Sequence, residues 1–131
     1  MSSKSEILTG LLEDLSRASQ GNIQASLIIS RSQGLTICSH YPAALGEGLI
    51  PDEDVIAGRT TQIQMATGKV FKELKRGPLV RMLIEGDNGY VIIGGAGDDA
   101  ILAVLTNRKV NLGYLFFMLS KIARQIAQTL T

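Results

Sequence analysis

The chain is poor in the residues that mark several common protein classes. It has 131 residues, of which none is tryptophan, one is cysteine and 5% are aromatic. Because Cys38 has no partner in the chain, an internal disulfide framework is excluded and a reducing compartment is indicated. The few aromatic residues do not alternate with basic ones, as they would on a platform for stacking nucleic-acid bases.

Charge of either sign is also sparse and dispersed. Charged residues make up 19% of the chain and the formal net charge is +1. No basic run is longer than residues 72–76, so the clustered basic face of a nucleic-acid-binding protein is not predicted. No apolar run reaches the ~18 residues that span a bilayer, and the polar N-terminus is unlike a signal peptide. We therefore expect a cytoplasmic protein that forms a single domain over residues 1–131.

Three segments have the apolar spacing of amphipathic helices. They cover residues 4–20, 51–74 and 112–130. Ser3 and Glu6 match a capping box ahead of the first helix. Pro51 and the carboxylates of residues 52–54 suit the first turn of the second helix, because carboxylates are stabilised at the positive end of the helix dipole. A charged first turn explains these carboxylates more simply than a cation site does. Asn111 is placed to cap the third.

Five short segments are predicted as strands. They cover residues 25–30, 35–39, 79–85, 90–93 and 100–105. The first two form a hairpin in which Gly34 supplies a positive φ, and residues 41–50 form a loop. The last strand is apolar throughout, as expected at the centre of a sheet that is covered on both faces. The element order α-β-β-α-β-β-β-α predicts an α+β fold with an antiparallel sheet between helices.

The middle helix carries more apolar and small surface than one sheet face can cover. Small residues also let a second backbone approach, so we expect a helix–helix contact between two chains. The alternative is that Gly58 and Gly68 relieve crowding against the sheet. The third strand is apolar and has no proline or lysine to protect its edge, which favours pairing with a symmetry mate. The predicted dimer interface comprises Ile56, Arg59, Thr60, Ile63, Thr67, Val70, Val80, Met82 and Ile84.

Two arginines lie nearest this predicted interface. Arg59 and Arg81 could pair across a dimer or reach another protein, and an arginine supplied in trans to a GTPase is physically possible. We favour solvated side chains for both.

Other arrangements that could carry chemistry are better explained structurally. Residues 94–99 resemble a phosphate-binding loop, but a strand follows where a helix is needed, so a tight turn is predicted. Cys38 and His40 share a strand face, yet one residue of each type cannot close a zinc shell without carboxylates. We expect a strand-end cysteine and a solvent-facing histidine. No catalytic residue, metal or cofactor is predicted.

Several stretches together resemble the Roadblock/LC7 family. They are the hairpin over residues 25–35, the turn–strand–turn–strand run over 85–105, and Asn111-Leu112-Gly113 ahead of the final helix. The resemblance covers nearly the whole chain, although no single motif is diagnostic. One departure is Ile29-Ser30-Arg31-Ser32, which replaces an acidic turn common in the family.

The resemblance implies a profilin-like α/β/α sandwich with five strands in the order 2-1-5-4-3. It also implies a homodimer in which the middle helices pair and the third strands join edge to edge. Family members serve as dynein light chains, as platforms in lysosomal signalling complexes, and as MglB-like regulators of small GTPases. They have no catalytic residues of their own.

The function expected on this basis is that of a homodimeric scaffold or regulator that binds other proteins, among them a small Ras-like GTPase. The partner would dock on the middle-helix face or on the opposite face, built from the first and third helices. One alternative is a small-molecule sensor of profilin- or PAS-like architecture, which would need a concave pocket with a few polar groups. An enzyme is the weakest alternative, because no acid, base or nucleophile constellation is present.

Overall fold

The computed structural model describes residues 3–42 and 51–131, and its elements follow the predicted order. They are α1 (Lys4–Ala18), β1 (Ile23–Ser30), β2 (Thr36–His40), α2 (Glu53–Glu73), β3 (Arg81–Gly86), β4 (Gly89–Gly95), β5 (Ala100–Thr106) and α3 (Leu112–Leu130). The loop predicted over residues 41–50 lies outside the described residues, except for residues 41 and 42.

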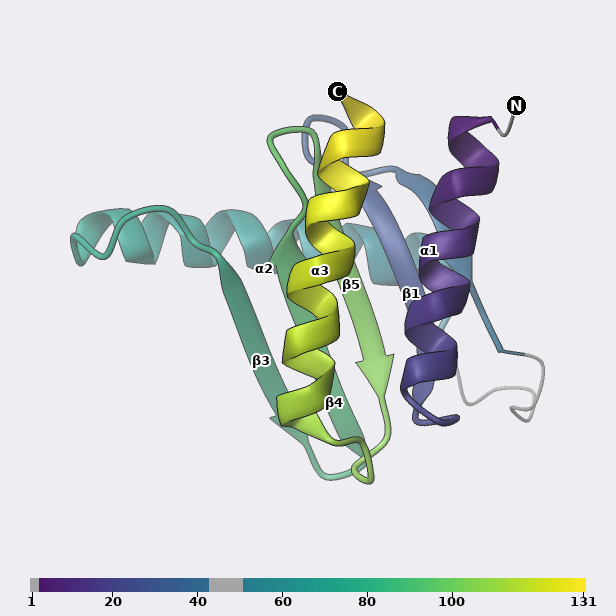
Figure 1. Cartoon of the computed structure of the whole chain (residues 1–131). Coiled ribbons are helices and arrows are strands. Elements are labelled where there is room, and N and C mark those ends of the chain that lie inside the picture. The colour runs from purple at the N-terminus through teal and green to yellow at the C-terminus, as the bar shows by residue number, and fades with distance from the viewer. Residues whose placement is uncertain (1–2, 43–50) are drawn as a thin grey trace.

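The five strands form one antiparallel sheet in the order β2-β1-β5-β4-β3 (Figure 1). This is the expected order and it confirms the predicted fold class. β5 lies in the middle of the sheet, and all its residues except Leu105 are buried. A central strand has side chains packed against both of its faces, which explains why the sequence of β5 is apolar almost throughout.

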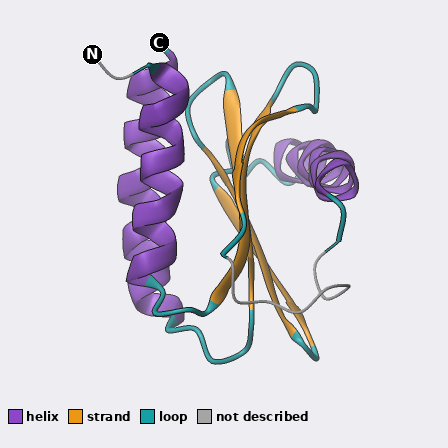
Figure 2. Ribbon diagram, turned by 90° about the vertical axis from the view of Figure 1, so that its right-hand side faces the viewer, coloured by secondary structure: helices purple, strands orange, loops and turns teal. Residues whose placement is uncertain are grey.

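Helices cover both faces of the sheet (Figure 2). α1 and α3 pack side by side on one face, where Leu12, Leu15, Leu119 and Ile122 meet the sheet in the larger core. α2 lies on the other face over a smaller core that includes Leu27 of β1. The sandwich therefore has two helices on one side and a single helix on the other.

Local sequence signals explain where the helices begin. Ser3 Oγ accepts a hydrogen bond from the Glu6 amide at 3.2 Å, and Asn111 Oδ1 accepts one from the Tyr114 amide at 3.0 Å. Asp52 occupies the corresponding position before α2 without a side-chain bond of this kind. The cap-forming residues predicted for α1 and α3 are thus confirmed.

The hairpin tip between β1 and β2 packs beneath α2 and holds a neighbouring turn. Gly34 has the positive φ predicted for it, 68°, and an added Cβ would lie 3.2 Å from Thr61 Oγ1 of α2. Arg31 Nε donates to the Gly97 carbonyl at 3.1 Å, which links this tip to the turn between β4 and β5. Gly97 also has a positive φ, 85°, and the turn predicted over residues 94–99 covers only residues 96–99, because Gly94 and Gly95 pair with neighbouring strands as the end of β4.

Candidate functional site

α2 divides into two halves with different surroundings. Its buried residues are Ile56, Ala57, Thr60 and Gln64, and every later residue of the helix is at least partly exposed. At a rise of about 1.5 Å per residue, the helix is roughly 30 Å long. Its C-terminal half continues past the sheet into solvent as an overhang, here residues 65–73 (Figure 1).

The structure separates the residues predicted for the dimer interface into two groups. Ile56 and Thr60 are only 6% and 3% exposed and face the chain's own sheet, so they are not free to meet a partner. Helical spacing placed them correctly beside Ile63 and Val70, but it could not show where the sheet beneath the helix ends. Ile63 is 36% exposed and Val70 47%, while Thr67 is half-buried.

The β3 edge continues the exposed apolar surface of the overhang. β3 pairs with β4 on one side, and no strand of the described part of the chain pairs with its other side. Val80, just before the strand, is 69% exposed and Ile84 is 38% exposed, whereas Met82 is half-buried. Leu83 points to the opposite face of the sheet, because its register partner Ile92 lies in the α1–α3 core. β3 therefore presents apolar side chains on both faces of an open edge.

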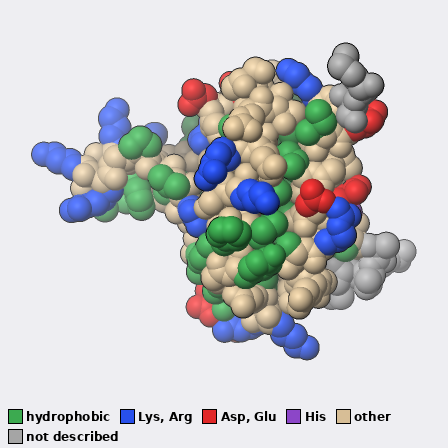
Figure 3. Space-filling view, in the orientation of Figure 1, with side chains coloured by type: hydrophobic (Ala, Val, Ile, Leu, Met, Phe, Trp, Pro, Cys, Tyr) green, Lys and Arg blue, Asp and Glu red, His purple; other side chains and the backbone are tan. Residues whose placement is uncertain are grey.

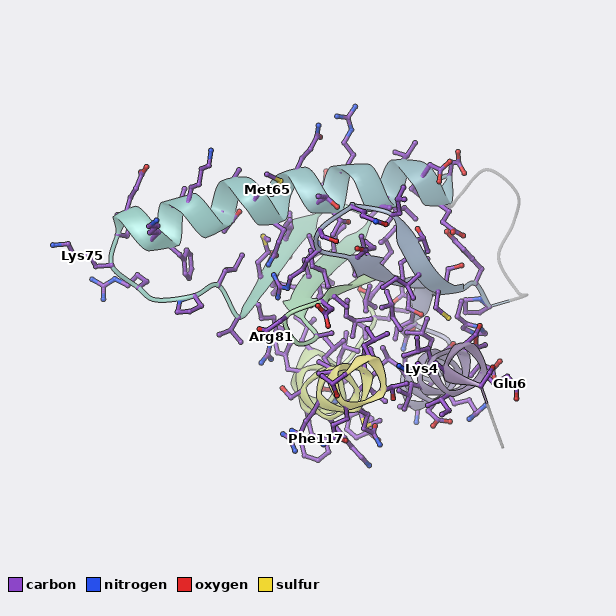
Figure 4. All side chains as sticks on the ribbon, turned by 90° about the horizontal axis from the view of Figure 1, so that it is seen from above. Lys4, Glu6, Met65, Lys75, Arg81 and Phe117 are labelled. Carbon is purple, nitrogen blue, oxygen red and sulfur yellow. The ribbon has the colours of Figure 1, made fainter. Side chains whose placement is uncertain are left out.

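A groove of about 790 Å³ runs beneath the overhang. It is lined by Gln64, Met65, Gly68 and Lys72 of α2, by residues 77–79, and by Arg31 and Asp98. The Gln64 side-chain oxygen is buried and has no hydrogen-bond partner among the described residues. Sequence reasoning missed Gln64, although its position four residues after Thr60 marks the sheet-facing side. Met65 of α2 (Figure 4) lines the groove. Its side chain is 64% exposed, so the groove combines an exposed apolar side chain with an unsatisfied acceptor.

The two glycines of α2 do not relieve crowding. A Cβ added at Gly58 or Gly68 would have no heavy atom within 4 Å outside the neighbouring helix backbone. The alternative explanation for these glycines is therefore wrong. Each glycine in a helix interior costs about 1 kcal/mol relative to alanine, and the described chain offers no packing gain in return.

Arg59 and Arg81 are both exposed, but they lie on different surfaces. Arg59 Nη1 donates to Gln62 Oε1 on α2 at 2.9 Å. Arg81 of β3 turns toward α3, where its guanidinium lies 5.2 Å from the centre of the Phe116 ring and Nη2 donates to Ser120 Oγ at 3.3 Å. Arg81 therefore belongs to the face opposite α2.

Cys38 and His40 differ from the sequence expectation. Cys38 occupies the centre of β2, half-buried, with its sulfur 3.2 Å from Thr9 Oγ1 of α1. His40 is half-buried and so only partly faces solvent, because β2 is paired with β1 and lies against α1. Within residues 3–42 and 51–131, no three His, Cys, Asp or Glu side chains are grouped so as to hold a metal ion.

The acidic start of α2 is tied to the body of the domain. Glu53 Oε2 accepts a hydrogen bond from Ser39 Oγ of β2 at 2.9 Å. Burial of the Tyr41 ring, followed by the nearby carboxylates of Glu53 and then Asp52, raises the pKa of the Tyr41 hydroxyl above its ordinary value. None of the helices in the described ranges is long and apolar enough to cross a membrane.

Comparison with known proteins identifies the family. The model of the Roadblock/LC7 domain matches residues 11–106. The chain belongs to the Roadblock/LC7 domain family. Protein MJ1340 of Methanocaldococcus jannaschii is 29% identical over 104 residues, covering 79% of this chain and 84% of that protein.

Solved structures confirm the fold of this Roadblock/LC7 chain. A structure of MglB with a tetrameric arrangement superposes on this chain with a TM-score of 0.89 and 19% identity, covering 98% of this chain and 91% of the MglB chain. Profilin II of Acanthamoeba castellanii superposes with a TM-score of 0.50 and 15% identity, over 86% and 90% of the two chains. The expected profilin-like architecture is thus confirmed.

Proposed function

We propose that this Roadblock/LC7 domain is a non-catalytic scaffold that forms a homodimer through α2 and β3 and docks a small Ras-like GTPase. The observation that carries the homodimer is the overhang of α2 beside the open β3 edge. The GTPase and the lack of catalysis rest on the family resemblance.

Several large apolar side chains are exposed on the overhang of α2, on β3 and at the adjoining ends of both elements. Five of them contribute, with exposures from 38% to 69%: Met65, Val70, Leu74, Val80 and Ile84. Large apolar side chains exposed in one region of a molecule favour a protein–protein contact. An unprotected strand edge likewise favours pairing with a second strand. A second copy satisfies both needs at once, because a two-fold axis brings the same two surfaces together.

Charges along α2 favour an antiparallel arrangement of the two helices. The first turn is acidic, with Asp52, Glu53 and Asp54, and the exposed far end is basic, with Lys72 and Lys75 (Figure 4). A two-fold axis beside β3 reverses the direction of the partner's α2, which moves its basic end toward the acidic end of the first helix. Each exposed pair adds only about 0.2–1 kcal/mol, so the charges set orientation more than affinity.

Docking of a GTPase would act through differential contact. A ligand shifts a two-state partner only when it binds one state more tightly than the other. The proposed dimer would supply a rigid platform for that contact. MglB, whose fold this chain shares, has a solved structure with a tetrameric arrangement, which supports self-association on this scaffold.

Sedimentation equilibrium across the micromolar range tests the homodimer. We expect a mass of two chains for the unaltered protein and of one chain for Val70→Glu. Ile7→Glu on α1 is the matched control, because Ile7 is 42% exposed, close to the 47% of Val70, and lies on the opposite face. A one-chain mass for the unaltered protein would remove the proposal, and so would equal effects of the two variants.

A binding and turnover assay tests the GTPase. A small Ras-like GTPase from the same source is loaded with GDP or with a non-hydrolysable GTP analogue and captured on the immobilised chain. Preferential capture of one form together with a changed rate of GTP hydrolysis would indicate a regulator. Capture with an unchanged rate of hydrolysis would indicate a passive platform. Failure to capture either form would count against the GTPase while leaving the homodimer intact.

A further inference from the structure

A second groove lies on the face opposite α2, between α3 and the β3–β4 hairpin. It measures about 270 Å³ and its walls are mostly apolar. Among the residues that line it are Arg81, Ile92, Gly94, Leu119, Ala123 and Arg124. α3 covers the neighbouring strands but leaves β3 uncovered at its side (Figure 1), so the groove opens beside α3.

A glycine keeps the floor of this groove open. Gly94 lies in β4 opposite Arg81, and a Cβ added there would have the Val80 carbonyl at 3.7 Å and Arg81 Cγ at 3.9 Å as its nearest neighbours. Glycine in a strand interior weakens the strand and commonly marks close approach of a ligand or another backbone. Nothing in the described chain crowds this position, so the strand leaves space that it does not fill itself.

Two arginines stand at the rim of the apolar walls. Arg81 is held in place by the Phe116 ring and by Ser120 Oγ, so its guanidinium is preorganised beside the groove. Arg124 lines the groove from α3 and is exposed. An apolar recess with two cations at its rim, of which Arg81 is held in place, matches a ligand with an apolar anchor and flanking carboxylates.

The charge of the surrounding segment strengthens this match. Residues 100–131 contain no Asp or Glu but include Arg108, Lys109, Lys121 and Arg124. Only Arg108 has an acidic partner among the described residues, Glu85 at 2.8 Å. Figure 3 shows Lys and Arg side chains beside apolar ones on the face over α3. The α3 side of the groove is therefore basic, whereas Asp98 and Asp99 follow Gly97 of its lining, so an acidic ligand would be drawn toward α3.

We propose that this groove docks an acidic peptide segment of a partner protein, with an apolar side chain inserted beside Gly94 and carboxylates on Arg81 and Arg124. The groove is smaller than the roughly 300–1,000 Å³ of typical small-molecule sites, but it accommodates one or two large side chains. Its apolar walls are recessed, whereas a membrane-bound helix presents projecting apolar side chains. Phe117 does project, away from the sheet (Figure 4), and it does not line the groove. The groove lies on the face opposite α2, but its lining includes Val80 and Arg81 at the β3 edge of the proposed homodimer, so the sedimentation mass of each variant is measured alongside its peptide binding.

Selection of peptides from a random library tests the site. The displayed library is panned on the full chain, and the enriched peptides are measured by fluorescence anisotropy. We expect enrichment of an apolar residue flanked by Asp or Glu. Arg124→Glu should weaken binding by about tenfold or more, whereas Lys121→Glu should change it by no more than about twofold. The two variants change the net charge equally, but only Arg124 lines the groove.

Two further variants separate the groove from its surroundings. Gly94→Val fills the floor without changing the charge, and it should remove binding while the circular dichroism spectrum is retained. Phe117→Ser should leave peptide binding unchanged. The proposal is overturned by enriched peptides without acidic residues, by equal effects of Arg124→Glu and Lys121→Glu, or by no enrichment. Binding to vesicles of phosphatidylserine and phosphatidylcholine that Phe117→Ser abolishes would likewise overturn it, in favour of a membrane surface.

Discussion

The two halves of α2 have the same periodic pattern but different surroundings. In the first half, Ile56 and Thr60 are buried on the sheet, and the hairpin tip packs beneath Thr61. In the second half, Met65 and Val70 project beyond the sheet, 64% and 47% exposed. An apolar stripe therefore marks which side of a helix seeks cover, but it does not say whether the same chain or another provides it.

The largest expected effect lies in the first half. Ile56→Ala should lower the free energy of unfolding by about 2–4 kcal/mol. The truncated side chain leaves a cavity against the chain's own sheet, which can close only in part. Met65→Ala should change the unfolding of the isolated chain by less than about 0.5 kcal/mol, since its side chain is largely exposed. Urea titration at a concentration that keeps the protein monomeric measures both.

The same pair should reverse its order in an association assay. Met65→Ala is expected to weaken the self-association measured by sedimentation. Ile56→Ala is expected to leave self-association unchanged, because Ile56 faces the chain's own sheet and does not contact the partner. If Met65→Ala destabilised the monomer as strongly as Ile56→Ala, the second half would be packed within one chain. The distinction between the two halves would then fail.

A smaller effect is expected at the glycine of the overhang. Gly68→Ala should stabilise the monomer by up to about 1 kcal/mol, because the added Cβ meets no atom and alanine favours the helix. Gly10→Ala in α1 is the control, since its Cβ also meets open space. If a partner backbone approaches Gly68, only Gly68→Ala will weaken association. Equal association of the two variants would show that no second chain comes close at this position.

Much of the architecture was predictable because it depends on local chemistry. Ser3 and Asn111 mark helix starts through hydrogen bonds to amides three residues away, so spacing alone reveals them. The run of apolar residues in β5 similarly indicates a strand covered on both faces. The strand order depends on contacts between distant segments, and it came from the family resemblance instead.

The composition of the surfaces was harder to predict, because burial depends on which elements lie opposite each other. Alternation does not identify the face of the sheet to which Arg81 turns, and helical spacing does not show where the support for α2 ends. Gln64 illustrates the limit, since a polar residue on the sheet-facing side is buried without a hydrogen-bond partner in the described chain. The groove beside α3 was missed because Gly94 falls in a glycine-rich segment whose pattern indicates only a turn.

The smallest predicted effect reports on the attachment of the first half of α2 through pH. Tyr41 packs against the smaller core, which includes Ile56 and Ala57 of α2, and burial, with Glu53 and Asp52, raises the pKa of its hydroxyl above 10.0. As pH rises past 10.0, the unfolded chain loses this proton before the folded chain does. Stability is therefore fully present below the unfolded pKa and falls as pH rises through the folded value. Tyr41→Phe should flatten this alkaline decline in urea titrations, and an unchanged slope would show that the ring is not held against α2 in solution.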